Sequence, residues 1–340
     1  NGCRVAALSG FSSVALQPNT NPVNDQQTAI SWVKSKAHNT AVDLYPIGAL
    51  SKSSNGHELA ELYDMKNAGA IAFGDYQKDI SDANLLKLAL QYSQDFQAQI
   101  IAFSMDKNLK GNGVVNEGVP STRLGLKGNP SLAEEIQIAR NLFLLEYTGG
   151  KLHLPTISSA GSVALIKQAK AKGLQVTCSV SVAHLVLTDE VLDGFDTRYK
   201  LMPPLRNEAD RLALVAGVLD GTIDVITSDH QPIDIEGKKL EFDLANYGSI
   251  GLESAFGALN SVLPLEKVIE KLTAGIQVFD MEPTSINIGQ KANLTLFNPN
   301  IHWTFSENAI LSKSKNAAFL GHPLKGKAYG IYNRNQLVIS

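Results

Sequence analysis

The sequence predicts an α/β fold in which a parallel sheet closes into a (β/α)8 barrel of the TIM type. Short apolar runs alternate with stretches of helical periodicity along most of the 340 residues, and strand–helix alternation with right-handed crossovers produces a parallel sheet. Seven such strands can be counted, and the chain opens on a helix, so one strand before Asn1 would complete the eight of a barrel. A dinucleotide-binding sheet would instead show GxGxxG after its first strand, where Leu8–Ser12 offers a single glycine.

Each predicted strand is rich in Val, Ile or Ala and is bounded by Gly, Pro, Asn or Asp. Most of the strands do not alternate between apolar and polar residues, as expected of strands that are buried on both faces. In chain order they are Ser12–Leu16, Val42–Ile47, Ala70–Phe73, Gln99–Phe103, Leu152–Ile157, Gln175–Val180 and Ile223–Thr227.

Helical spacing of apolar residues fills the segments between these strands. The predicted helices are Gln26–Ala37, Glu58–Ala68, Ser81–Asp95, Ser131–Glu146, Gly161–Ala171 and Glu208–Leu219. Ser81 with Asp82, and Ser131 with Glu134 three positions later, are typical capping signals at helix N-termini. Gly69 follows one predicted helix directly, where a glycine commonly ends the last turn.

The pattern changes after about Phe279. Two runs, Ile286–Phe297 with a turn at Gly289–Ala292, and Lys325–Ile339, are predicted to form short strands joined by Asn, Gly and Pro turns. We therefore expect a barrel domain over residues 1–280 and a small β domain over residues 281–340. Residues before Asn1 would complete the small domain, because chain termini tend to meet in space.

Composition and charge exclude several classes of protein. A hydrophobic fraction of 44% suffices for a full core, and no apolar run approaches the roughly 18–20 residues that span a bilayer. Thirty Lys and Arg stand against 33 Asp and Glu without a concentrated basic segment, which argues against nucleic-acid binding. Two distant cysteines, Cys3 and Cys178, form neither a disulfide framework nor a CxxC pair, which favours a cytoplasmic location.

Several short motifs occur along the chain, some of them directly after predicted strands, where the active site of a barrel lies. They are Pro18–Pro22, Asn116–Gly118, Gly161–Val163, Pro203–Arg206, Leu219–Asp224, Ser228–Pro232 and Ser312–Asn316. Their order and spacing resemble dihydroorotases, members of the amidohydrolase superfamily, and the similarity runs from residue 1 to about 330. The resemblance implies a role in pyrimidine biosynthesis, in which a zinc-bound hydroxide interconverts dihydroorotate and N-carbamoyl-aspartate.

Most of the metal ligands that this resemblance implies are replaced in the chain. The family's histidines after the fifth and sixth barrel strands fall on Phe103 and Thr156. Of the acidic pair after the fourth strand, Asp75 remains and Tyr76 takes the second position. The last-strand aspartate is kept as Asp229, whereas the family's first ligand pair, a His-x-His, would precede the first residue.

The substrate contacts implied by the resemblance are altered in the same way. Asn19 is kept, but Met202 stands for the asparagine before Pro-Pro-Leu-Arg, and Ile233 stands for a histidine. Phe, Met and Ile side chains neither ligate zinc nor donate hydrogen bonds to a carboxylate. The sequence therefore resembles a metal-ligand-deficient member in which catalytic Asp229 and substrate-binding Asn19 are vestiges.

We expect a metal-free, catalytically impaired protein. Some family members that have lost their metal ligands act as non-catalytic partners of aspartate transcarbamoylase, and barrels of the family commonly form dimers, so the resemblance implies both assemblies here. Two alternatives stay open. One is an active dihydroorotase with a reduced zinc site that uses Asp229 and Asp75, and the other is a module that binds a ureide without turning it over.

The histidines and two glycine pairs have structural interpretations. His153 lies within a strand and is expected in the core, His184 faces either helix packing or the mouth of the barrel, and His230 supports its neighbouring aspartate or a loop. Gly111–Gly113 and Gly248–Gly251 lack the GxxxxGK(S/T) spacing of a phosphate loop. They fit mobile loops over the mouth of a barrel better.

Overall fold

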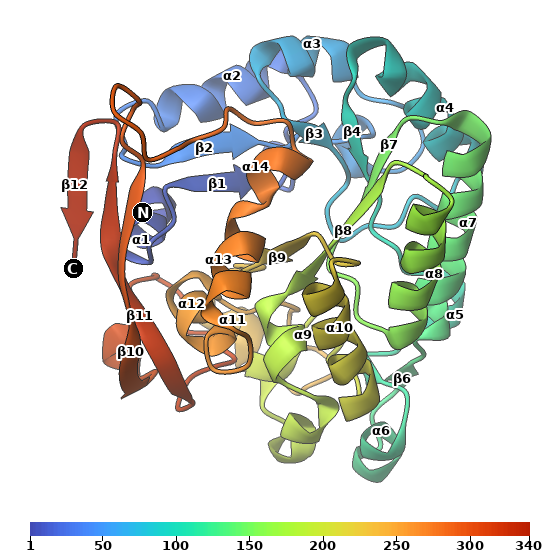
Figure 1. Ribbon diagram of the computed structural model, residues 1–340. Coiled ribbons are helices and arrows are strands. Elements are labelled where there is room, and N and C mark those ends of the chain that lie inside the picture. The colour runs from blue at the N-terminus through green and yellow to red at the C-terminus, as the bar shows by residue number, and fades with distance from the viewer.

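Seven parallel strands form one curved sheet in the computed structural model, which describes residues 1–340 (Figure 1). They are β1 (Ser13–Leu16), β2 (Asp43–Pro46), β3 (Ala72–Phe73), β4 (Gln99–Ile101), β7 (Lys151–Leu154), β8 (Val176–Ser181) and β9 (Val225–Thr227). β1 pairs with β2, and the other five pair in the order β3-β4-β7-β8-β9. A parallel bridge between Gly48 and Phe73 joins the two groups.

All seven predicted strands of the parallel sheet are confirmed. Their order along the sheet equals their order along the chain, which is the connectivity of a βα barrel. β1 and β9 form the two edges of the sheet and do not pair with each other. Closure into a full barrel with an eighth strand stays a prediction.

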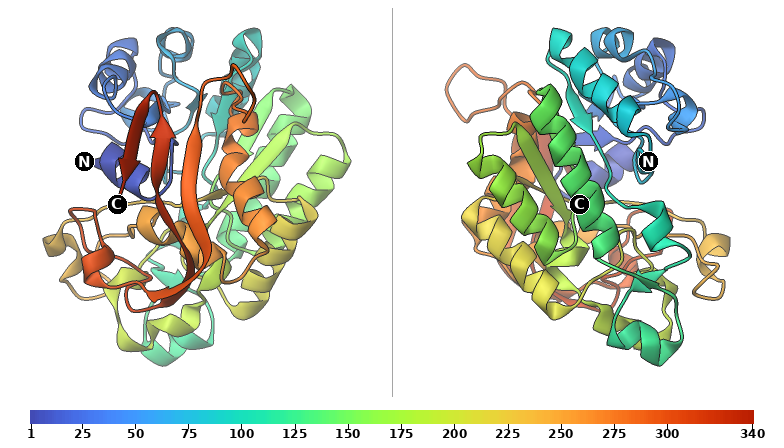
Figure 2. Two further views of the ribbon diagram at one scale, coloured as in Figure 1. Left: turned by 60° about the vertical axis from the view of Figure 1, so that its left-hand side comes forward. Right: turned by 90° about the vertical axis from the view of Figure 1, so that its right-hand side faces the viewer.

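Helices cover the outer face of this sheet, as the two views of Figure 2 show. The longer ones are α1 (Gly2–Leu8), α2 (Gln27–Lys36), α3 (Leu62–Ala68), α4 (Ala83–Ser93), α7 (Leu132–Thr148), α8 (Ala160–Ala171), α10 (Glu208–Asp220), α12 (Leu252–Leu259) and α13 (Leu265–Thr273). Ile100, Leu152 and Cys178 point from the sheet into the main core and are fully buried. Ile101 and His153 occupy the opposite face of the same strands and are buried as well. Burial on both faces explains why the strands do not alternate in sequence.

Short elements build the loops between strands and helices. They are the 3₁₀ turns Lys52–Ser54, Gln94–Phe96, Asp189–Gly194, Thr197–Tyr199 and Glu307–Ala309, the helices α5 (Lys107–Lys110), α6 (Val119–Leu124), α9 (Val182–Val186), α11 (Ile235–Lys238) and α14 (Gly275–Val278), and the strands β5 (Val115–Asn116) and β6 (Gly128–Asn129). β5 and β6 pair with each other inside the long connection from β4 to α7. This connection contributes much of the rim around the carboxyl ends of the strands.

The two predicted helix caps have different outcomes. Asp82 caps α4, because its carboxylate accepts the backbone N–H of Asn84 at 2.8 Å. Ser131 makes no capping hydrogen bond at α7. Its predicted partner Glu134 is buried and accepts the backbone N–H of Ser158 at 2.8 Å. The predicted capping box at α7 is wrong because a tertiary contact takes the glutamate.

The C-terminal strands form a separate antiparallel sheet, β10 (Leu294–Thr304), β11 (Pro323–Asn333) and β12 (Gln336–Ile339). β11 packs against α12 and α1, so the first and last elements of the chain lie close together (Figure 1). The predicted turn at Gly289–Ala292 is present, with Gly289 at a φ of +87°, but Ile286 and Ile288 before it are exposed and form no strand, so the first part of this prediction is wrong. The division into domains at residue 280 stays a prediction.

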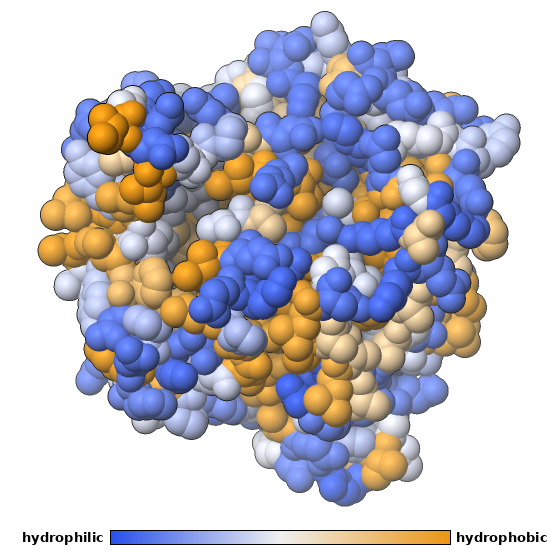
Figure 3. Space-filling model, in the orientation of Figure 1, coloured by the Kyte–Doolittle hydropathy of each residue, from blue (hydrophilic) through white to orange (hydrophobic).

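β12 is an edge strand with an apolar surface. Leu337 and Ile339 are 59% and 55% exposed, and Figure 3 shows apolar side chains at the left edge of the molecule, over this sheet. β12 pairs only with β11, so its other edge is open. Across the whole chain, none of the helices combines the length and apolar character that a membrane crossing requires.

Candidate active site at the carboxyl ends of the strands

Three residues with left-handed backbone mark the carboxyl ends of three different strands. Tyr76 after β3, Thr156 after β7 and Asp229 after β9 have φ angles of 58°, 47° and 43°. Each such conformation costs roughly 1–3 kcal/mol for a non-glycine residue, and these conformations cluster at functional sites. All three are predicted site positions, and seven other non-glycine residues of the chain also have positive φ angles.

Asp229 and Tyr76 meet at the side chain of Gln231. The amide Nε2 of Gln231 donates to Asp229 Oδ1 at 3.2 Å. Burial raises the pKa of Asp229 to about 6, against the smaller opposing effect of this hydrogen bond. Burial also raises the pKa of the Tyr76 phenol, and the Asp229 charge adds to that increase. Asp229 is therefore a carboxyl that can accept or release a proton near neutral pH.

Replacing Asp229 with asparagine is expected to stabilise the protein at high pH. The pKa of this carboxyl is near 6 in the folded state, against 3.8 in the unfolded state. Its contribution to the free energy of unfolding is therefore fully present below about pH 3.8 and is lost as the pH rises through 6. In urea titrations, Asp229→Asn should raise the free energy of unfolding at pH 8 by on the order of 2 kcal/mol and leave it unchanged at pH 4. An equal change at both pH values would show that Asp229 is not destabilised by its burial.

The Asp75 carboxylate accepts hydrogen bonds from the neighbouring loop, which follows β2. Its Oδ1 accepts the backbone N–H groups of Leu50 at 3.0 Å and Ser51 at 3.1 Å, and its Oδ2 accepts the Ser51 hydroxyl at 2.5 Å. The residue is 5% exposed. These three bonds engage both carboxylate oxygens with the loop after β2. This explains why an aspartate persists here independently of any metal.

Phe103 belongs to an apolar cluster that fills the rim. It is buried with Met105, Ala133 and Met202, and Tyr247 packs against them; these five residues are called the mouth cluster below. The side-chain amide of Gln77 donates to the backbone carbonyl of Met202 at 2.8 Å and ties the loop after β3 to this cluster. Two predicted site positions therefore belong to a small hydrophobic core.

Thr156 and His153 lie beside β8, as strand pairing requires. The two ring nitrogens of His153 lie 2.9 Å from Thr177 Oγ1 and 3.1 Å from Ser179 Oγ. Burial lowers the pKa of His153 to about 3, so the ring is neutral. Ser179 also accepts the backbone N–H of Thr156 at 3.2 Å. His153 is thus a satisfied interior residue, as predicted.

The other two substrate-contact positions lie in loops. Asn19 is exposed and its side chain makes no hydrogen bond within the chain. Ile233 is held through its backbone: its N–H donates to Asn316 Oδ1 at 3.2 Å, and its carbonyl accepts the Ser314 hydroxyl at 2.7 Å. Asn316 Nδ2 also donates to the carbonyls of Gln231 and Gly248. The sequence motif ending in Asn316 therefore fastens the loop after β9.

Arg206, the last residue of the motif Pro203–Arg206, lies at the centre of a buried hydrogen-bond network. The sequence alone predicts no role for this residue. The guanidinium of Arg206, which is 2% exposed, donates to Ser158 Oγ at 3.1 Å and to Asn116 Oδ1 at 3.0 Å. Glu134, 1% exposed, accepts from the same Ser158 and from Ser162 Oγ at 2.6 Å. The network joins the loops after β4, β7 and β8. A buried charge pair with shared hydrogen bonds produces no periodic signal in a sequence.

His184 and His230 fasten loops. The ring nitrogens of His184 lie 2.7 Å from Ser181 Oγ and 3.2 Å from the Pro203 carbonyl, and burial lowers its pKa to about 4. His230 Nδ1 accepts the backbone N–H of Gly251 at 3.2 Å, at the start of α12. Both ring nitrogens of His184 are engaged in its contacts with Ser181 and Pro203. His184 faces packing, which resolves its two predicted alternatives.

The residues of this chain at the rim do not by themselves supply a complete set of zinc ligands. Zinc sites use three or four His, Cys, Asp or Glu ligands, and the chain shows no cluster of three such residues that could hold a metal. Of the two predicted carboxylate ligands, Asp75 is bound by the loop after β2, and Asp229 accepts a hydrogen bond from Gln231. Phe103 has no donor atom, and Thr156 offers only a neutral hydroxyl.

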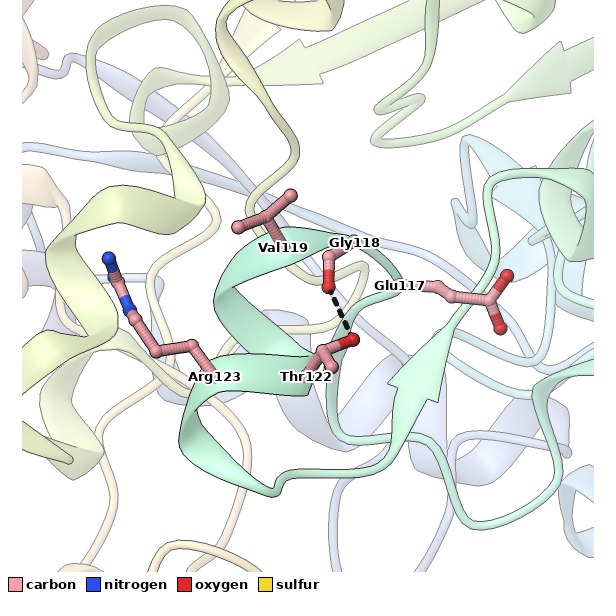
Figure 4. A pocket seen from close by; sticks show the side chains of 5 residues that line it. All are labelled: Glu117, Gly118, Val119, Thr122 and Arg123. Carbon is pink, nitrogen blue, oxygen red and sulfur yellow. Dashed lines mark hydrogen bonds between the residues drawn. The ribbon is translucent and has the colours of Figure 1, made fainter.

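A hollow near α6 offers no alternative catalytic set. It has a volume of about 560 Å³ and is lined by Glu117, Gly118, Val119, Thr122 and Arg123. The Thr122 hydroxyl donates to the Gly118 carbonyl at 3.1 Å, and the side chains of Glu117 and Arg123 point to opposite sides (Figure 4). No acid, base and nucleophile converge there.

Comparison with known structures confirms the α/β fold. L-Hydantoinase (dihydropyrimidinase) from Arthrobacter aurescens superposes with a TM-score of 0.85 over 99% of this chain and 79% of its own, at 22% identity. Dihydropyrimidinase from Brevibacillus agri gives a TM-score of 0.81 over 99% of this chain and 78% of its own, at 20% identity. At these identities the likeness shows the fold alone.

Comparison of sequences shows the family as well as the fold. The family described as dihydro-orotase-like matches residues 1–162. Dihydroorotase of Pelotomaculum thermopropionicum is 43% identical over 332 residues, which covers 96% of this chain and 78% of that protein. Dihydroorotase of Geotalea daltonii is 38% identical over 96% of this chain and 79% of its own length. Such identity across almost the whole chain means that this protein belongs to the dihydroorotase family.

Proposed function

We propose that this chain is a dihydroorotase-family protein of pyrimidine biosynthesis that holds no zinc at the rim and does not hydrolyse dihydroorotate at enzyme rates. The mouth cluster carries this proposal, because Phe103 and Met202 stand where the resemblance implies a zinc ligand and a substrate contact, and both are buried against Met105 and Tyr247. A packed apolar cluster can neither bind a cation nor donate to a ureide.

The free energies that zinc and a general base each supply to catalysis favour the same conclusion. A bound zinc lowers the pKa of water from about 15.7 to about 7, which corresponds to on the order of 12 kcal/mol of proton-removal free energy. The remaining proton acceptor is Asp229, with a pKa of about 6. General-base catalysis contributes about 10²–10⁴-fold, or roughly 3–5 kcal/mol. Asp229 alone therefore falls several kcal/mol short.

An active enzyme with a reduced zinc site is the competing candidate. The names of the relatives favour it, and so does the retention of Asp229 with its left-handed backbone. It requires further ligands beyond those that the rim supplies. A ureide-binding module without turnover is the third candidate, and a rise in melting temperature with N-carbamoyl-aspartate would favour it, since a ligand of the native state stabilises that state.

Activity separates the first two candidates. Purified protein supplied with zinc is expected to give no conversion of dihydroorotate or N-carbamoyl-aspartate above the buffer rate, followed by absorbance in both directions. Turnover within the ordinary range of about 1–10³ s⁻¹, abolished in Asp229→Asn, would overturn the proposal. An active family enzyme assayed in parallel provides the positive control.

We further propose that the protein acts as a structural partner of aspartate transcarbamoylase and also forms a homodimer. The transcarbamoylase partner is implied by the resemblance to metal-deficient family members, and the homodimer by the resemblance to barrels of the family in general. An apolar stripe on α7 supports an interaction role: Leu132, Ile136, Phe143 and Tyr147 are 48%, 44%, 71% and 78% exposed, and their spacing places them along one side of the helix. Exposed apolar surface of this kind marks interaction sites.

Size-exclusion chromatography with the aspartate transcarbamoylase of the same organism tests this role. We expect one co-eluting peak at micromolar concentration, which Phe143→Glu should split by placing a charge within the stripe. Trp32→Glu, at another exposed aromatic residue on α2 (61% exposed), should leave the peak intact. Two separate peaks with the unmodified protein would contradict the partnership.

A further inference from the structure

We propose that the hollow beside Tyr247 is a binding site for a small phosphorylated molecule, recognised through its phosphoryl dianion. The hollow has a volume of about 290 Å³ and is lined by Lys110, Gly111, Asn112, Val114, Lys127, Asp243 and Tyr247. These residues come from the connection after β4 and from the loop after β9, so the hollow adjoins the mouth cluster through Tyr247. It is distinct from the Asp229 site.

The lysines of this hollow have no carboxylate partners. Neither Lys110 nor Lys127 forms an ion pair or a side-chain hydrogen bond within the chain. Burial lowers the pKa of Lys110, and no acidic neighbour offsets that effect. A partly buried ammonium without a counter-charge is unfavourable in the free protein. A bound anion would supply the missing counter-charge.

A third cation lies behind the hollow. Lys200 is 2% exposed, and its ammonium donates to the carbonyls of Phe242 at 2.7 Å and Asp243 at 2.9 Å. The ammonium groups of Lys200 and Lys110 lie 4.8 Å and 5.8 Å from the centroid of the Tyr247 ring. Asp243 is the single acid in the lining. Three ammonium groups against one carboxylate leave the hollow positive.

The arrangement of donors favours a phosphoryl group over a planar carboxylate. The Tyr247 hydroxyl and the Asn112 amide line the hollow and make no hydrogen bonds within the chain, so they add neutral donors to the two lysines. Lysine binds phosphate as a point charge, whereas planar bidentate recognition is typical of arginine, which is missing from this lining. Donors from separate loops suit a tetrahedral group that accepts in several directions.

Titration calorimetry with inorganic phosphate at pH 7 and fixed ionic strength tests the site. The unmodified protein should show saturable binding with one site per chain. Lys110→Gln and Lys127→Gln should each weaken binding by about tenfold, the effect of one charge-assisted contact. Lys107→Gln, at an exposed lysine in the same short helix, should change the affinity by less than about twofold.

Two further measurements identify the ligand chemistry. Tyr247→Phe keeps the ring and removes the hydroxyl, and it should weaken phosphate binding by a few fold. Succinate at equal ionic strength should bind more weakly than phosphate. The proposal is overturned by a lack of saturable phosphate binding at millimolar concentration, by equal affinities of Lys110→Gln and Lys107→Gln, or by succinate binding more tightly than phosphate.

Discussion

Replacing Arg206 with alanine is expected to lower the free energy of unfolding by about 3–5 kcal/mol. The guanidinium is almost completely buried and donates to Ser158, Asn116 and the backbone carbonyl of Asn129. Its removal leaves the buried carboxylate of Glu134 without a neighbouring cation, and that uncompensated charge dominates the loss. Urea unfolding followed by circular dichroism measures the change.

Two further variants test whether the loss comes from the buried charge of Glu134. Arg123→Ala removes an arginine whose side chain is 49% exposed and pairs with Asp193 at the surface, and it should cost at most about 1 kcal/mol. Combining Arg206→Met with Glu134→Gln removes both charges and should recover a large part of the loss. If Arg206→Ala were no more harmful than Arg123→Ala, the network would not join the loops as described.

Replacing Phe103 with alanine should cost about 3–5 kcal/mol, the usual loss for a buried phenylalanine. Phe103 is 4% exposed and packs in the mouth cluster with Met105 and Met202. An open catalytic rim would relax or fill with water around the smaller residue, whereas a packed cluster retains an unfavourable cavity. The free energy of unfolding from urea titration distinguishes the two.

Phe143→Ala is the matched control for this substitution. Phe143 lies on α7 with 71% of its surface exposed, so the same change in side chain should alter the free energy of unfolding by only about 0.5 kcal/mol. Similar losses for both variants would contradict the assignment of Phe103 to a packed cluster. The apolar rim would then need another explanation.

The parallel sheet and its six main helices could be predicted because periodicity and strand-end residues are local signals. The strand Gln99–Phe103 was correctly placed, although β4 itself ends at Ile101. The capping box at Ser131 failed because Glu134 is used in a contact with Ser158, which local sequence does not encode. β10 begins at Leu294, just after the predicted turn, but the segment before that turn forms no strand, since apolar Ile286 and Ile288 are exposed.

Site positions were predictable where the resemblance supplied them, but their surroundings were not. The resemblance predicts that Asp75 and Asp229 are both acidic residues retained at metal-ligand positions. The structure shows that Asp75 holds the loop at Leu50 and Ser51, while Asp229 faces Tyr76 and Gln231. Carboxylates look alike in a sequence, and only their hydrogen-bond partners separate a structural role from a chemical one.

The hollow beside Tyr247 could be predicted from the sequence even less than the surroundings of Asp75 and Asp229. Its lysines, Lys110 and Lys127, stand 17 positions apart and more than a hundred positions before Tyr247. Gly111 and Gly113 do not match the spacing of a phosphate loop. The structure favours an anion for a different reason, the meeting of unpaired ammonium groups from separate loops.

Zinc content tests the central claim most directly. Protein purified with zinc in the medium and freed of loosely bound metal should contain far less than one zinc per chain by elemental analysis, and crystals should show no anomalous signal at the zinc edge beside Asp229. Stoichiometric zinc, held at about 2.0–2.2 Å by nitrogen and oxygen ligands at the carboxyl ends of the strands, would contradict the account.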